Sequence, residues 1–175
     1  MRVFAVDPGL ERSAFVLWNG QRIEQHGIVS NEDLLLRLYE AIVVSDANDE
    51  DAPVLVVEAM TSYGMAVGQS TLDTIFWAGR FYQSVQPCQA EVLARRIVKI
   101  NLCGSAKAKD SNIRMALIDR FGGSKEVAIG LKTSKGPLYG ITSHCWAALA
   151  VAVTWFDQAS AVAHLIDDPT PVIPF

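Results

Sequence analysis

The stretch VFAVDPG, residues 3–9, places an acid at the end of a buried strand and follows it with a turn. A second stretch, VLVVE at residues 54–58, ends in the same way on Glu58. A carboxylate is costly inside a core strand, because burying an unpaired charge is unfavourable. At the carboxyl end of a strand, where the chain emerges into a crevice, the same group can meet a metal or a substrate. The two stretches predict that Asp7 and Glu58 converge on one site.

The chain around these two stretches predicts a mixed sheet. Apolar runs and a hairpin signal at Asn19-Gly20 indicate an antiparallel meander of three strands, at residues 2–7, 13–18 and 22–29. The strand that ends at Glu58 and a short strand at 90–93 follow later. Helices are expected from a Ser30 cap onward, at 69–84, over or near 95–100, at 110–121 and at 143–156. This order is that of the ribonuclease H-like fold, an α/β fold with a mixed five-stranded sheet flanked by helices.

Three of these segments carry more detailed expectations. In the helix at 69–84, an apolar stripe with Leu72, Ile75, Phe76 and Tyr82 is expected to face the core, with Gly79 as a close packing point. Residues 124–140, rich in glycine and lysine, are interpreted as a mobile loop over the site. The helix at 143–156 is apolar nearly all round and is expected to be buried. One domain is therefore predicted over 1–156, with a loosely attached tail at 157–175.

Composition limits the class of protein. The chain has 175 residues, half of them hydrophobic, which suits one globular domain. It shows neither an uninterrupted apolar run of membrane-spanning length nor a signal peptide. The three cysteines, Cys88, Cys103 and Cys145, are odd in number and widely spaced, as expected for free thiols in a reducing compartment. We expect a cytoplasmic protein, in a bacterium or a phage-infected host cell, with no membrane partner.

The net charge of −4 conceals one basic sector. Ten of the fifteen Lys and Arg residues, but only three acids, lie between Arg95 and Lys135. Such a sector can bind a polyanion locally even in an acidic protein. It can equally be a solvated helical face.

Side chains near the last helix complete the candidate site. In the predicted fold the first and fourth strands are neighbours, so Asp7 and Glu58 can share a hard cation such as Mg²⁺. His144 is placed at the start of the last helix, and position 147 is three residues further on, on the same face. A His and an acid at this spacing would complete a metal cluster, but the residue here is Ala147.

At this point the chain resembles the RuvC family of Holliday-junction resolvases, over residues 1–156. The resemblance rests on VDPG at 6–9, VVE at 56–58, GSAKAKD at 104–110 and HCWAALAVA at 144–152. In relatives the last motif reads Asp or His, two residues, Asp, then Ala-Leu-Ala. Ala147 takes the place of that second Asp, while Ala-Leu-Ala follows in register.

The resemblance implies a homodimeric enzyme that cuts four-way DNA junctions with symmetric nicks and needs no small-molecule cofactor. It implies Mg²⁺, with Mn²⁺ as a substitute, held by Asp7, Glu58 and His144, with the catalytic position 147 occupied by alanine. Two explanations of Ala147 stand: a deliberately disabled variant, or a natural member that uses another ligand or only binds. Under either, we predict that this sequence cleaves poorly.

DNA contacts are predicted in the basic sector and beside Glu58. A loop of small residues before a helix start favours phosphate, because backbone amides and the helix dipole add to the lysine charges. The predicted phosphate contacts are Arg95, Arg96, Lys99, Lys107 and Lys109. In the loop after Glu58, Tyr63 is the candidate wedge against an opened base step.

Each feature has a plainer interpretation. Asp7 suits a turn, His144 a helix start, the lysines solubility, and the loop near Tyr63 local packing. In the helix at 69–84, Trp77 and Phe81 are a candidate dimer contact or ordinary core.

The rival functions come from other classes. A nucleotide-binding ATPase of the actin and sugar-kinase type shares the fold, but it needs a second domain that 175 residues do not provide. An RNA-processing nuclease of the same fold and a non-cleaving branched-DNA-binding protein both remain open.

Overall fold

The structure is a computed structural model that describes residues 1–48, 51–61, 64 and 66–167. Its main sheet has five strands in the order β3-β2-β1-β4-β5. They are β1 Val3–Asp7, β2 Arg12–Trp18, β3 Ile23–Ser30, β4 Val54–Ala59 and β5 Ala90–Ala94. The first three pair antiparallel, whereas β4 pairs parallel with both β1 and β5. The predicted ribonuclease H-like sheet is therefore confirmed.

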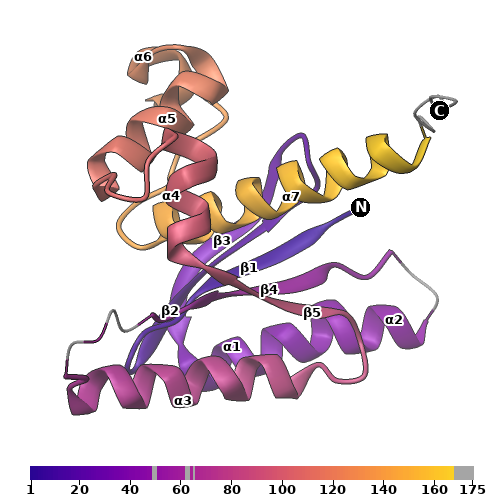
Figure 1. The fold of residues 1–175 in the computed structure, drawn as a ribbon. Helices are drawn as coiled ribbons and strands as arrows, with labels where there is room; N and C mark the ends of the chain where they lie inside the picture. The colour runs from indigo at the N-terminus through magenta and orange to yellow at the C-terminus, as the bar shows by residue number, and fades with distance from the viewer. Residues whose placement is uncertain (49–50, 62–63, 65, 168–175) are drawn as a thin grey trace, which may run out of the picture.

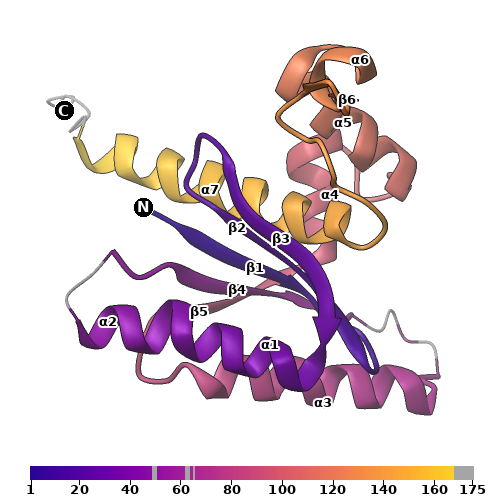
Figure 2. The ribbon, with the colours of Figure 1, turned by 180° about the vertical axis from the view of Figure 1, so that it is seen from behind.

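Helices cover both faces of this sheet. On one face lie α1 and α3, and on the other lies α7, with α4, α5 and α6 extending beyond it (Figures 1 and 2). The helices are α1 Asn31–Leu38, the π-helical turn η1 Tyr39–Val44, α2 Ser45–Ala47, α3 Gln69–Ser84, α4 Arg95–Cys103, α5 Asp110–Gly122, α6 Lys125–Ala128 and α7 Cys145–Asp167. As predicted, the Ser30 hydroxyl caps α1 by accepting a hydrogen bond from the Asp33 amide, at 3.1 Å.

Strands β1 and β4 are buried on both faces, which explains their unbroken apolar runs. Alternate residues of β1 enter two separate cores. Val3 and Ala5 pack with α7, whereas Phe4 and Val6 pack with α1 and α3. Only the last residue of each run is an acid, so the sheet delivers both carboxylates to one edge.

Helix α3 lies at the predicted residues but presents the opposite face. Phe81 is fully buried, while Leu72 and Phe76 of the expected core stripe are 49% and 66% exposed. A Cβ atom added at Gly79 would meet nothing within 4 Å, so this glycine is not a close packing point. The predicted orientation is wrong because the helix carries apolar residues on two faces, and only its position on the sheet decides between them.

The segment 124–140 is not the predicted loop. It forms α6 and a small hairpin of β6 Gly130–Leu131 and β7 Ser134–Lys135, packed beside α5. Its glycines make close approaches: a Cβ at Gly136 would lie 2.2 Å from the Val127 carbonyl oxygen. The glycine content therefore serves tight packing.

Helix α7 continues past the predicted end at Phe156 to Asp167. Asp157 accepts two hydrogen bonds from Arg120, at 2.6 and 2.7 Å, and one from Asn101 at 2.9 Å. The chain after residue 156 thus begins as an anchored helix, which corrects the expectation of a loose tail from 157 onward.

Helix α7 is also the one helix in the described ranges that is long and apolar enough to cross a membrane, from Cys145 to Ala163. More than half of that window, 56%, is buried inside the protein. Its apolar character is accounted for by the core that it forms with β1 and β2.

Candidate active site

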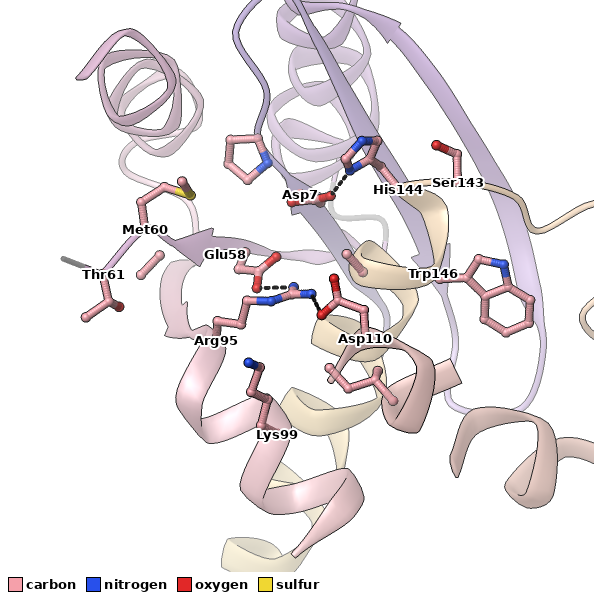
Figure 3. A pocket seen from close by; sticks show the side chains of 14 residues that line it. Asp7, Glu58, Met60, Thr61, Arg95, Lys99, Asp110, Ser143, His144 and Trp146 are labelled. Atoms are coloured by element: carbon pink, nitrogen blue, oxygen red, sulfur yellow. Dashed lines mark hydrogen bonds and ion pairs between the residues drawn. The ribbon is translucent and has the colours of Figure 1, made fainter. Parts of the chain in front are cut away.

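Asp7 and Glu58 end neighbouring parallel strands. The β1–β4 register pairs Val6 with Val57, so the two acids that follow lie side by side at the carboxyl edge. Their side chains are 15% and 4% exposed, and both line one pocket of about 570 Å³ (Figure 3). The structure thus brings together the two carboxylates that the sequence placed 51 positions apart.

His144 joins the pocket from the other side. Its Nδ1 atom lies 3.1 Å from Asp7 Oδ2, while most of the ring is exposed (Figure 3). The residue stands just before α7, whose first residue is Cys145, rather than inside the helix as expected. Ser143, at φ 45°, turns the chain into α7 at this point and also lines the pocket.

Arg95 lies at the centre of the pocket with both ends of its guanidinium group engaged. Nη1 donates to Glu58 Oε1 and Nη2 donates to Asp110 Oδ1, each at 2.6 Å (Figure 3). Arg95 begins α4 directly after β5, and β5 pairs with β4 up to Ala59. The sheet register therefore brings Arg95 next to Glu58.

Burial controls the charge of the two acids. The pKa of Glu58 is raised to about 7: loss of hydration is the main cause, the Arg95 charge opposes the rise, and the neighbouring Asp7 adds to it. Burial also raises the pKa of Asp7, against the lowering effects of Glu58, His144 and Arg95. Burial therefore makes the ionised form of either acid depend on a nearby positive charge, which Arg95 supplies at Glu58.

The side chains of the pocket include the type of donor that a hard cation prefers, but only a few of them. Carboxylate oxygens are the ligands that Mg²⁺ and Mn²⁺ prefer, and Asp7 and Glu58 supply them. Ala147 lines the same pocket and contributes no donor. Within the described residues, no three His, Cys, Asp or Glu side chains gather closely enough to hold a metal ion. The residues present fit one cation held by the two carboxylates, with His144 alongside.

The predicted phosphate contacts fall into two groups. Lys99 lines the pocket with Arg95, and the Arg95 guanidinium faces acids instead of solvent. Arg96, Lys107 and Lys109 are exposed outside it, the last two in the connection between α4 and α5. The predicted wedge, Tyr63, lies outside the described residues.

Sequence reasoning missed Asp110 as a pocket residue. It begins α5, and its side chain is 78% exposed apart from the contact with Arg95. Trp146 and Ile113 also line the pocket. The signal for Asp110 was present, because it closes the GSAKAKD motif, but nothing local pairs it with an arginine fifteen residues earlier.

No protein-family model matches this chain, and no curated protein matches it either. Among solved structures, RuvC of Thermus thermophilus shares the fold with a TM-score of 0.56 and 17% identity, covering 93% of this chain and 97% of that one. T. thermophilus RuvC in complex with a Holliday junction substrate gives a TM-score of 0.59 and 18% identity, covering 93% and 96%. The chain therefore has a RuvC-like fold over nearly its whole length.

Proposed function

We propose that this chain is a structure-selective endodeoxyribonuclease that binds four-way and related branched DNA in the cytoplasm. Metal-dependent phosphodiester hydrolysis would be its reaction, and Ala147 would leave it weakly active. The observation that carries the proposal is the convergence of Asp7 and Glu58 at the carboxyl edge of adjacent parallel strands, beside His144 and a basic sector. The choice of substrate is supported by the similar fold of T. thermophilus RuvC, whose structure has been solved in complex with a Holliday junction substrate.

The residues divide the work by position. Asp7 and Glu58 would hold Mg²⁺ or Mn²⁺, which when bound supplies a Lewis acid and lowers the pKa of a coordinated water. His144, next to Asp7, orients that carboxylate and can accept or donate a proton at its ring nitrogen. Lys99 places a positive charge at the pocket for the substrate phosphate. Ala147 leaves this set one carboxylate short, which favours a non-cleaving branched-DNA-binding protein as the second candidate.

Branch selectivity tests the proposal directly. We expect the protein to bind a labelled four-way DNA junction at least tenfold more tightly than a linear duplex or an RNA–DNA hybrid of equal length. Gel-shift titrations in Ca²⁺ at fixed ionic strength give the three dissociation constants. Equal affinity for junction and duplex would contradict the proposal that branched DNA is the substrate. Preference for the hybrid would favour the RNA-processing alternative.

Salt dependence tests the lysines before α5. Lys107→Ala and Lys109→Ala should each weaken junction binding and reduce the slope of log K against log salt by about 1, because each loses one phosphate contact. Arg22→Ala is the matched control, since Arg22 is exposed at the β2–β3 turn, at the opposite end of the strands. An unchanged slope in both lysine variants would assign them to a solvated face.

Metal affinity should depend on pH through Glu58. Binding requires the ionised carboxylate, and the pKa of about 7 means that a proton competes with the metal below neutrality. Calorimetric titration should therefore show Mn²⁺ affinity about tenfold weaker at pH 6 than at pH 8, levelling off above the pKa. His144→Ala should keep this dependence and Glu58→Gln should lose it. The same affinity at both pH values in the unsubstituted protein would contradict the assignment.

A homodimer is proposed through α3. Leu72, Ile75, Phe76 and Tyr82 form an exposed apolar face on this helix, of the kind that marks a protein contact. Phe76→Glu should therefore convert a dimer to a monomer in sedimentation equilibrium. Met115→Glu, at an exposed apolar residue of α5, is the control and should leave the dimer intact. At about 100 μM protein, even a weak dimer with a dissociation constant in that range would be partly formed. If the unsubstituted protein is still monomeric at that concentration, the proposed dimer is wrong.

A further inference from the structure

Arg95 is fixed by two ion pairs, unlike an exposed arginine whose guanidinium group is free to bind a phosphate. Its guanidinium joins two carboxylates that come from different elements, Glu58 at the end of β4 and Asp110 at the start of α5 (Figure 3). Both contacts are 2.6 Å, and the arginine side chain is only 29% exposed. Such charge-assisted bonds are short and directional. The sequence interpretation of Arg95 as one more phosphate contact does not anticipate this arrangement.

The burial of Glu58 explains why a positive charge beside it is favourable. Glu58 is 3% exposed, and an ionised carboxylate at that depth is costly without a compensating positive charge. In a two-metal nuclease site, ions roughly 4 Å apart provide this compensation between bridging acids. Here a guanidinium lies between two acids in the same pocket, in contact with each. Its charge is permanent, because arginine does not lose its proton in proteins.

We propose that the Arg95 guanidinium takes the place of a second divalent cation between Glu58 and Asp110, so that the protein binds a single Mg²⁺ or Mn²⁺ at Asp7 and Glu58. The inference rests on the metal site of the proposed function and specifies its stoichiometry.

A guanidinium performs only part of the work of a metal. The bonds to Glu58 and Asp110 use two of its N–H groups, and those that remain can hold an oxygen of a substrate phosphate at the pocket. It stabilises negative charge in this way, but it neither coordinates a water nor lowers that water's pKa. Arg95 is therefore a phosphate-positioning residue whose own position is set by the two acids.

The test counts bound ions and uses no DNA. Mn²⁺ is titrated into the full chain, free ion is followed by electron paramagnetic resonance, and folding is checked first by circular dichroism. We expect one ion in the unsubstituted protein and two in Arg95→Gln, the pair giving a spin-coupled spectrum. Arg96→Gln removes the same charge one residue along α4, from a side chain outside the pocket, and should bind one ion. Adding Asp110→Asn to Arg95→Gln should return the count to one.

The outcomes separate this inference from the proposed function. Two ions in the unsubstituted protein, or one in folded Arg95→Gln, would overturn the role of Arg95 and leave the nuclease proposal standing. No Mn²⁺ in either protein would overturn metal dependence and this inference together. Should Arg95→Gln fail to fold, the count in the unsubstituted protein decides alone: one ion supports the inference and two ions overturn it.

Discussion

Ala147→Asp is expected to raise Mg²⁺-dependent cleavage of a four-way DNA junction by about ten- to a hundredfold, the range typical of groups that support a metal site. The physical reason is position. Ala147 lines the pocket with Asp7, Glu58 and His144. An aspartate at this position would therefore place a third carboxylate beside those of Asp7 and Glu58. The added ligand would raise the number of carboxylates without moving the backbone of α7.

The measurement compares single-turnover cleavage of a labelled junction by the two proteins. Paired, symmetric nicks that appear only with Ala147→Asp would support both the resolvase activity and the disabled site. Ala147→Asn is the matched control, because it has nearly the same size as the acid without its charge. If both proteins bind the junction and neither cuts it, the chain is a binding module. Full cleavage by the unsubstituted protein would contradict the prediction that it is weakly active.

Phe81→Ala is expected to destabilise the fold by about 3–5 kcal/mol, the usual cost of emptying a large buried side chain. Phe81 is fully buried in the core between the sheet and α3, where its ring stacks on Trp77 at 5.8 Å between centroids. Phe76, five residues earlier on the same helix, is 66% exposed. The same substitution there should cost the monomer about 0.5 kcal/mol or less.

Urea unfolding at two protein concentrations separates core from interface. The cost of Phe81→Ala should be the same at both, because the lost contacts lie within one chain. Any cost of Phe76→Ala should shrink on dilution, since the stability that dimer association adds grows with the logarithm of protein concentration. A larger cost at Phe76 than at Phe81 would mean that α3 packs on the sheet as its sequence first indicated.

Much of the candidate site followed from local pattern. Each acid directly follows an apolar run, so it can be recognised from the residues of its own strand. The Pro-Gly that follows Asp7 also marks the end of the first strand. Three other features depend on residues a few positions apart and were predicted correctly: the three-strand meander, the Ser30 cap and the first and last residues of α3. The order of these elements then determined which strands are neighbours, and so placed Asp7 beside Glu58.

Local pattern was insufficient where a segment offered two surfaces or an unexpected partner. Helix α3 has apolar residues on opposite faces, and the helical period cannot rank them. The glycines of 124–140 indicate conformational freedom in sequence, yet they allow close backbone contact in α6 and its hairpin. The continuation of α7 past Phe156 is anchored by Arg120 and Asn101, which reach Asp157 from other helices.

The sequence by itself determined the positions of the strands and the two acids at the ends of β1 and β4, because each of these features is written in residues that are adjacent along the chain. Only the tertiary structure decided that Phe81 and not Phe76 is core, and that Arg95 belongs to Glu58 and Asp110. Those partners are 37 and 15 residues from Arg95. Charge pairing across such separations is set by the register of β4 and β5 and by the start of α5, which no local pattern encodes.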